Sequence, residues 1–275
     1  MTYSTRVSKG LTVLAALFFL PGGASAQLSE AYLTLYEDLP DWNGVWQMIG
    51  STIFDHATVE PPGVRAGRPG VREHPPYNDQ WEAKYLANIE NVRRDRFPDP
   101  LTTCGTAPGF PRTMNLPGAI EFIVRPEQVW ILTEDGPSIM RIFTDGRSHP
   151  PADEMWPTYS GESVGQWEGD TLVFETIGLK GEGDTILDRT GLVLSEQARI
   201  TTRLRRINDG TMEARMIIED SEALTDEWLV TKQYELLPAG SRMFDVSCAE
   251  NNRNPVDATG RTLTLDAEGN VLDVE

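Results

Sequence analysis

The 275-residue sequence has two cysteines, three histidines and no apolar run long enough to cross a bilayer. The histidines are widely separated, which argues against a histidine-rich metal site. The chain also has no phosphate-binding loop, no dinucleotide fingerprint and no Gly-x-Ser-x-Gly nucleophile motif. We therefore expect no cofactor and no metal site, although calcium held by carboxylates alone stays an open alternative.

Positive charge is scarce as well. The chain has 24 lysines and arginines against 42 aspartates and glutamates, which gives a net charge of −18. A surface of this sign repels nucleic acid and anionic lipid, so we expect neither as a partner. The acidic residues are spread along the chain rather than gathered in blocks, which is compatible with a small-molecule ligand or substrate. Nothing in the sequence indicates the oligomeric state.

The N-terminal region has the order of a secretory signal. Arg6 and Lys9 precede an apolar core at residues 11–20, and a small-residue cleavage motif ends at Ala26. The alternative is a membrane anchor, which requires about 20 apolar residues, whereas this core has ten. We expect cleavage of residues 1–26 near Ala26 and a periplasmic or secreted protein without a membrane span.

The two cysteines, Cys104 and Cys248, are far apart in the sequence. An exported protein with two cysteines is expected to form one disulfide bond between them. Two buried free thiols are the alternative. A metal site on these residues is not expected, because neither belongs to a Cys-x-x-Cys pair.

Short segments with a period of two dominate the chain after residue 119. They are joined by turn signals, of which Asn208-Asp209-Gly210 is the clearest. We predict an all-β protein, a lipocalin-like up-and-down β-barrel of about 8–10 strands, because closure removes the exposed edges of a long meander. A sandwich of two antiparallel sheets is the alternative.

One amphipathic helix is predicted at residues 78–94, where Trp81 and Tyr85 begin an apolar face at helical spacing. A single such helix in a strand-rich chain is expected to pack across the barrel. We assign the mature chain, residues 27–275, to one barrel domain. A loop and helix insertion at about 54–117 and a peripheral tail at about 253–275 belong to it.

The stretch from Phe143 to Gly178 departs from the plain pattern of strands and turns. It begins with a polar cluster, continues through a proline- and aromatic-rich crossing, and ends in a hairpin with Gly169 at its turn. The hairpin has the pattern of its neighbours and is expected to be scaffold. The part from Asp145 to Glu162 interrupts the meander, and a long irregular segment in a compact domain usually has a function. We therefore expect the site there.

Several motifs give the chain a resemblance to a largely uncharacterised family of secreted bacterial proteins. They cover nearly the whole mature chain and are DWNGVW at 41–46, Met114-Asn115, TDGRxHP at 144–150, GxWEGDTLV at 165–173 and CxENN at 248–252. The resemblance implies a lipocalin-like, calycin-type β-rich domain and supplies no reaction. Members of the family often have histidines where this chain has Glu162 and Gln166, and another after the segment matching Asp188-Arg189. This chain departs at all three positions, so imidazole chemistry there is doubtful, or Glu162 replaces it.

Four residues are predicted to be catalytic. His149 can serve as a general acid or base near neutral pH, and Glu162 can do the same if aromatic neighbours desolvate it. Asp188 is the expected partner from elsewhere in the chain, and Arg147 is expected to stabilise developing negative charge. The alternatives are that His149 caps a loop, that Glu162 is a solvated strand end and that Asp188 pairs locally with Arg189.

Five further residues are predicted to bind substrate. Asp145 belongs to the polar cluster beside His149, and Trp156 and Tyr159 lie in the crossing, where they can form a lid or a ligand wall. Arg141 and Glu121 alternate with apolar residues on two strands. If they face the barrel interior they can form a buried pair that orients a polar ligand, and otherwise they are solvated.

The sequence leaves three functions open. The first is an exported, cofactor-independent enzyme of lyase, isomerase or cyclase type that transfers protons on a small apolar or aromatic molecule in a barrel cavity. The second is a periplasmic carrier with the same fold and no chemistry. The third is a carbohydrate hydrolase with two carboxylates about 5–10 Å apart.

Overall fold

The computed structural model of the chain describes residues 30–50, 52, 74–104, 109–135, 138–181, 186–244, 246, 255–266 and 268–272. The predicted signal at residues 1–26 lies outside the described residues, and so does Cys248. No helix in the described ranges is long and apolar enough to span a membrane.

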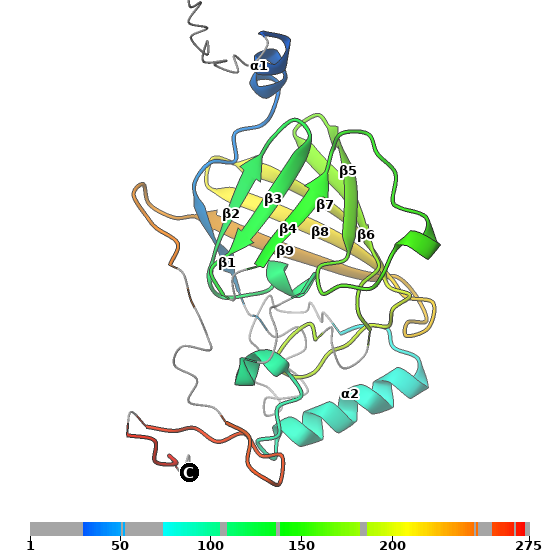
Figure 1. Cartoon of the computed structure of the whole chain (residues 1–275), viewed down its shortest axis with the longest axis vertical. Coiled ribbons are helices and arrows are strands. Elements are labelled where there is room, and N and C mark those ends of the chain that lie inside the picture. Colours follow the sequence, from blue (N-terminus) through cyan, green and yellow to red (C-terminus); the bar gives the residue numbers. More distant parts are fainter. Residues whose placement is uncertain are drawn as a thin grey trace, which may run out of the picture.

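Nine strands form a closed barrel in the described part of the chain (Figure 1). Strand β1 pairs with both β2 and β9, which closes the sheet. This confirms the all-β, lipocalin-like barrel, and the β-sandwich alternative is wrong. The strands are β1 (Val45–Ile49), β2 (Ala119–Val124), β3 (Gln128–Thr133), β4 (Ser138–Phe143), β5 (Glu162–Glu168), β6 (Thr171–Ile177), β7 (Arg199–Asn208), β8 (Thr211–Glu219) and β9 (Trp228–Leu236).

One step of the barrel differs from the up-and-down pattern. Strands β4 and β5 are parallel, with Ile142 opposite Ser163, whereas every other neighbouring pair is antiparallel. A parallel step requires the chain to return along the barrel before the next strand begins. Residues 144–161, called here the crossing segment, make this return and stand out from the barrel wall (Figure 1). They include a short 3-10 helix, η4 (Ala152–Glu154).

Large side chains fill the barrel interior. Trp46, Phe174 and Tyr234 are inward-facing residues of three strands, and all are buried. A second 3-10 helix, η3 (Arg112–Met114), lies across one end, where the Tyr234 hydroxyl donates a hydrogen bond of 2.7 Å to the Met114 carbonyl.

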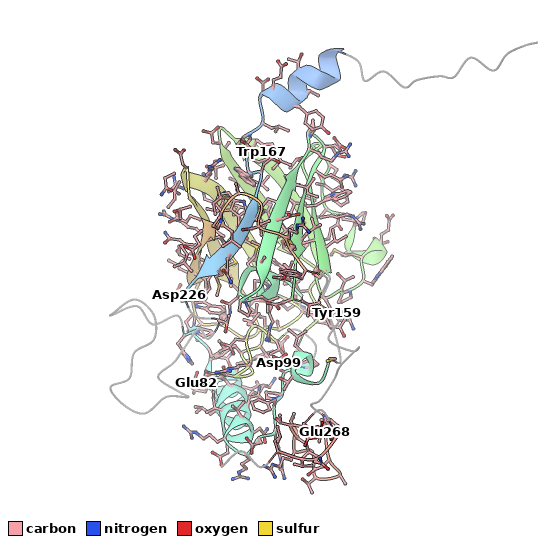
Figure 2. The ribbon with its side chains drawn as sticks, turned by 90° about the vertical axis from the view of Figure 1, so that its left-hand side faces the viewer. Glu82, Asp99, Tyr159, Trp167, Asp226 and Glu268 are labelled. Atoms are coloured by element: carbon pink, nitrogen blue, oxygen red, sulfur yellow. The ribbon has the colours of Figure 1, made fainter. Side chains whose placement is uncertain are left out.

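Tryptophans close the other end of the barrel. The Trp42 ring lies 5.1 Å from that of Trp167 and 5.9 Å from that of Phe122, both in edge-on geometry. Figure 2 shows Trp167 at this end and Asp99 beyond the opposite end. The interior is therefore a packed core between two capped ends in the described part of the chain.

The predicted amphipathic helix is confirmed as α2 (Asp79–Val92), and a shorter helix, α1 (Glu30–Glu37), precedes the barrel. The Asn78 side chain caps α2 by accepting from the Trp81 amide. α2 lies beyond the η3 end of the barrel (Figure 1), against residues 186–193. There Asn88 donates to the Gly191 carbonyl at 2.8 Å, which ties the helix to the connection between β6 and β7.

Gly165 shows how closely the wall at β5 is packed. A Cβ atom at this position would lie 2.7 Å from both the Phe174 Cβ and the Val173 carbonyl oxygen. We expect Gly165→Ala to lower the free energy of unfolding by about 2 kcal/mol, because backbone atoms must move to admit the methyl group. Urea unfolding measures the change. Gly210→Ala is the control, since the atom nearest to its Cβ would be the Asn208 Oδ1 at 3.9 Å, and equal losses in both variants would contradict the prediction.

Cys104 ends a 3-10 helix, η2 (Pro100–Thr103), with a left-handed backbone at φ 57°. Its expected partner, Cys248, lies outside the described residues, so the disulfide bond stays a prediction. Alkylation of the unreduced, unfolded protein followed by mass spectrometry should label no cysteine. Two labelled thiols would show that the bond is absent.

Candidate functional site

The polar residues of the crossing segment meet the outer face of the barrel wall. In β5, Ser163 is buried and its hydroxyl hydrogen bonds to that of Thr176, so its neighbour Glu162 faces outward. Glu175 of β6 faces outward too, opposite Val164. The predicted site therefore assembles on the outside of the barrel.

His149 fastens the crossing segment to this face. Its Nε2 lies 3.3 Å from Oε1 of Glu175, and the Arg199 Nη1 contacts the same oxygen at 2.5 Å. Both ring nitrogens of His149 are buried and have no hydrogen-bond partner of good geometry among the described residues. A ring whose nitrogens are buried beside a carboxylate suits an anchor better than a base that must reach substrate.

Arg147 is held by Asp145. The guanidinium donates from Nε at 2.9 Å and from Nη2 at 2.6 Å to the two carboxylate oxygens. This bond lowers the pKa of Asp145 and raises the pKa of Arg147. The negative charge of nearby Glu162 also raises the pKa of Arg147, by a smaller amount. Arg147 therefore lies close to Glu162, but the Nε and Nη2 groups of Arg147 already donate to Asp145.

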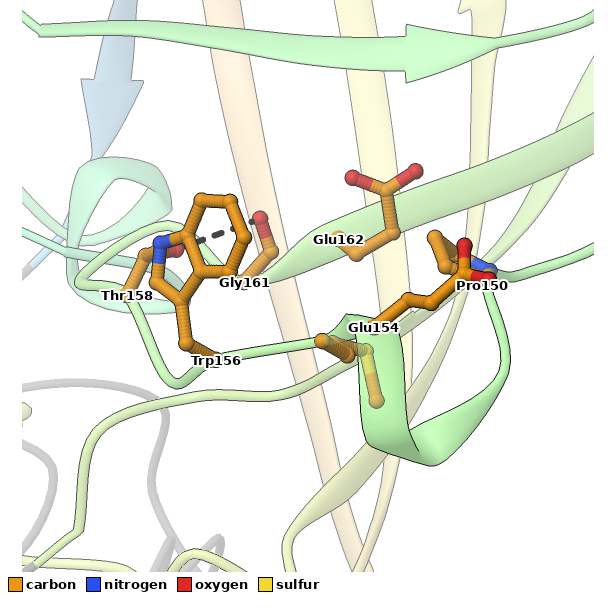
Figure 3. Close-up of a pocket in the computed structure, with 7 residues that line it drawn as sticks. Pro150, Glu154, Trp156, Thr158, Gly161 and Glu162 are labelled. Carbon is orange, nitrogen blue, oxygen red and sulfur yellow. Dashed lines mark hydrogen bonds between the residues drawn. The ribbon is translucent and has the colours of Figure 1, made fainter.

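A cavity of about 170 Å³ lies between the crossing segment and the start of β5 (Figure 3). We call it the crossing pocket. Glu162 and Glu154 both reach it, with the Trp156 indole on the other side of Glu162. Neither carboxylate forms a hydrogen bond or ion pair with a described residue, and Trp156 is 74% exposed. The residues lining it are Pro150, Glu154, Met155, Trp156, Thr158, Gly161 and Glu162.

The structure thus brings together part of the predicted set. Glu162 and Trp156 line the crossing pocket, and Asp145, Arg147 and His149 lie on the same outer wall. This arrangement can bind a small molecule and exchange protons with it. The barrel interior, where a ligand cavity was predicted, is occupied by core side chains in the described part of the chain.

Asp188 does not join this group. It is 1% exposed, and its Oδ1 accepts hydrogen bonds from the Thr190 amide at 2.8 Å and the Thr190 hydroxyl at 2.5 Å. Its charge acts on Asp99 and Tyr77 instead. Asp188 was predicted as the partner of the crossing segment, but in the structure it stabilises a local turn beyond the η3 end of the barrel.

Three other predicted residues also lie outside the pocket lining. The Tyr159 ring lies 4.5 Å from the Lys180 Nζ, and its carbonyl accepts from the Phe110 amide, so it joins the crossing segment to the η3 region. Glu121 and Arg141 face outward on β2 and β4, with β3 between them. They therefore do not form a buried pair inside the barrel.

Sequence reasoning missed Glu154, Glu175 and Arg199. The sequence Pro150-Pro151 followed by acidic residues signals an exposed turn, which does not distinguish Glu154 from a solvated residue. Glu175 alternates with apolar residues as any outward strand position does. Its contact with His149 depends on the parallel step between β4 and β5.

A second polar cluster lies between the barrel and α2 and has a structural role. Arg112 of η3 donates from Nη2 to Asp99 at 2.7 Å and from Nη1 to the Ile186 carbonyl at 3.4 Å. Burial raises the pKa of Asp99, although the charge of Arg112 opposes the effect. Arg112 therefore links η3 both to Asp99 and to the connection between β6 and β7.

The closed barrel places the chain in the structural class of lipocalin-like β-barrels. No family model and no curated protein matches the sequence. The resemblance to a family of secreted bacterial proteins therefore stays a prediction.

Replacing His149 tests its role as an anchor. We expect His149→Ala to raise amide hydrogen exchange in the crossing segment about fivefold, the effect of roughly 1 kcal/mol, because the contact with Glu175 is lost. His74→Ala is the matched control, since His74 contacts Glu82 of α2 at 2.7 Å. Unchanged exchange in the crossing segment of His149→Ala would contradict the anchor role.

Proposed function

We propose that this protein is a cofactor-independent enzyme that transfers protons on a small molecule bound in the crossing pocket. A lyase, isomerase or cyclising reaction fits this chemistry. The observation that supports it most is the meeting of Glu154 and Glu162 in one cavity beside an exposed indole. The export predicted from the N-terminal sequence places the reaction in the periplasm or outside the cell.

Glu162 is the proposed general base. It begins β5 and pairs with Ile177 of β6, so its backbone is held by the barrel wall. Side chains on strands are positioned more accurately than those on loops. A substrate that covers the pocket displaces water from the carboxylate, which favours proton uptake.

Glu154 is the proposed second carboxylate of this proton path, which takes up the proton that Glu162 removes and returns it to the product. It comes from η4 and therefore reaches the pocket from the crossing segment rather than from the barrel wall. Two carboxylates on different elements can approach a substrate from two directions. Trp156 forms the apolar wall, and His149 positions the crossing segment through Glu175.

Two other functions keep some support. A carbohydrate hydrolase also uses two carboxylates, and the exposed Trp156 offers a flat apolar face of the kind on which sugar rings stack. A carrier requires the pocket alone. Release of reducing sugar separates the hydrolase from the proposed enzyme, and binding without turnover identifies the carrier.

The proposed function is tested by incubating the purified mature protein with mixed small-molecule extracts and following each compound by mass spectrometry. We expect at least one compound to be converted by the wild type and by Glu235→Gln, an exposed residue of β9. The Glu154→Gln/Glu162→Gln double variant should leave that compound unchanged. Equal conversion by the double variant would overturn the proposed site.

A further inference from the structure

We propose that the crossing pocket is specific for an organic cation, an ammonium group attached to a small apolar or aromatic body. This inference rests on the proposed function only in using the same pocket. Three observations support it. The lining residues carry negative charge, they also offer apolar surface, and the nearby basic side chains already contact other residues.

The lining contains two acidic residues and no basic one. Glu154 and Glu162 have no ion-pair partner among the described residues, so a ligand with a negative charge would meet two carboxylates that no ion pair neutralises. Like charges at one site repel, and a cation between them removes that repulsion. A neutral ligand would leave it in place.

The nearby basic side chains are already engaged. Arg147 donates from Nε and Nη2 to Asp145, and Arg199 contacts Glu175. The Lys180 ammonium lies over the Tyr159 ring, outside the lining of the pocket. None of these described basic residues forms an ion pair with Glu154 or Glu162, and Asp145 balances the charge of Arg147, which lies close to Glu162.

The remaining lining selects for the organic part of the ligand. Pro150, Met155 and the Trp156 indole supply apolar surface, and the Thr158 hydroxyl is directed to the Gly161 carbonyl at 3.4 Å (Figure 3). An indole face attracts ammonium groups through its negative π surface, and Trp is the strongest of the aromatic residues in this respect. A hydrated metal ion makes no use of such a wall, whereas an alkylammonium ion does.

The net negative charge of the whole chain also favours a cationic ligand. Without residues 1–26 it has 22 basic and 42 acidic residues, a net charge of −20. A surface potential of that sign concentrates cations and repels anions before they reach the pocket. Screening by salt weakens this attraction at long range and leaves short-range contact with Trp156.

The test uses benzyltrimethylammonium as the probe, with benzyl alcohol and benzoate as its neutral and anionic counterparts. Binding is followed by NMR of the ¹⁵N-labelled indole groups, with the Trp156 signal assigned from Trp156→Phe. We expect a saturable shift of the Trp156 signal by the cation at about 0.15 M salt. Benzoate should cause none, and benzyl alcohol should bind at least about tenfold more weakly.

Matched variants distinguish cation binding at the pocket from the general attraction of cations to the negatively charged protein surface. Glu154→Gln/Glu162→Gln should weaken cation binding about tenfold or more. Trp156→Ala should weaken it about threefold, as measured by isothermal titration calorimetry against the wild type, since this variant lacks the reporting indole. The control, Glu121→Gln/Glu235→Gln, removes the same charge from two outward strand positions elsewhere on the barrel and should have no effect. Equal binding of the three probes, or equal loss in both double variants, would overturn the proposal.

The outcomes also separate this inference from the proposed function. If the cation binds as expected while Glu162→Gln retains full turnover of the enzyme's substrate, the catalytic proposal fails and the cation site stands. If Glu162→Gln abolishes turnover while the three probes bind equally, the enzyme stands and the substrate class is wrong.

Discussion

Replacing Arg112 by methionine is expected to lower the free energy of unfolding by about 3 kcal/mol at neutral pH. Arg112 and Asp99 are 8% and 3% exposed, and they form an ion pair of 2.7 Å. Methionine fills much of the space of the arginine stem but leaves the Asp99 carboxylate buried without its counter-charge. The loss of the bond to the Ile186 carbonyl adds to the effect.

The loss should depend on pH in a defined direction. The pKa of Asp99 in the folded protein is already above its ordinary value of 3.8, because burial disfavours the charged form. A carboxyl with a raised folded pKa contributes most to stability at low pH, and that contribution falls as pH rises through the folded pKa. Removing Arg112 raises this pKa further, so the difference between wild type and variant should shrink on acidification.

Urea unfolding at neutral and mildly acidic pH measures both effects. Asp99→Asn/Arg112→Met should recover most of the stability, since no buried charge remains. Arg93→Met is the control, because Arg93 is exposed and pairs with Glu90 at 3.7 Å, and it should change stability by less than about 0.5 kcal/mol. A double variant no more stable than Arg112→Met would show that the buried charge is not the cause.

Glu162→Gln is expected to reduce kcat/KM about 10²–10⁴-fold on the compound that the enzyme converts, which is the usual contribution of a positioned base. Glutamine keeps the shape of the side chain and its place on β5 but cannot take up a proton. The reduction should fall on kcat. KM should change less for a neutral substrate than for a cation, because a cation also loses an ionic contact.

Steady-state kinetics with three matched variants checks this assignment. Glu154→Gln should also reduce kcat, and the two single reductions should not add in the double variant if the carboxylates act on one proton path. Glu235→Gln should leave both constants unchanged. A normal kcat for Glu162→Gln, with substrate still bound at the pocket, would remove Glu162 as the base.

The sequence predicted the fold well because the barrel depends on local patterns. Alternation with a period of two identified the strands from β2 onward, and the aromatic spacing in α2 identified the helix. The parallel step between β4 and β5 was not predicted. Strand direction across a long irregular segment depends on tertiary pairing, which the residues of the crossing segment do not encode locally.

The segment in which the site was predicted contains the crossing pocket, but some residues around that pocket were not predicted. Glu162 and Trp156 line one pocket, but Glu154 and Glu175 become visible only once the register of the outer wall is known. Asp188 could have been excluded earlier. Its place two residues before Thr190 is typical of an aspartate that accepts hydrogen bonds within its own turn.

We propose that the active site lies in the crossing pocket, outside the barrel. The most direct measurement is an NMR titration of ¹⁵N-tryptophan-labelled Glu162→Gln protein with the compound that the wild type converts. We predict that the Trp156 indole signal moves and saturates, while the signal of Trp46, whose indole donates to the Trp42 carbonyl inside the barrel, stays fixed. A saturable shift of Trp46 with an unchanged Trp156 signal would place the site in the barrel interior and contradict the claim.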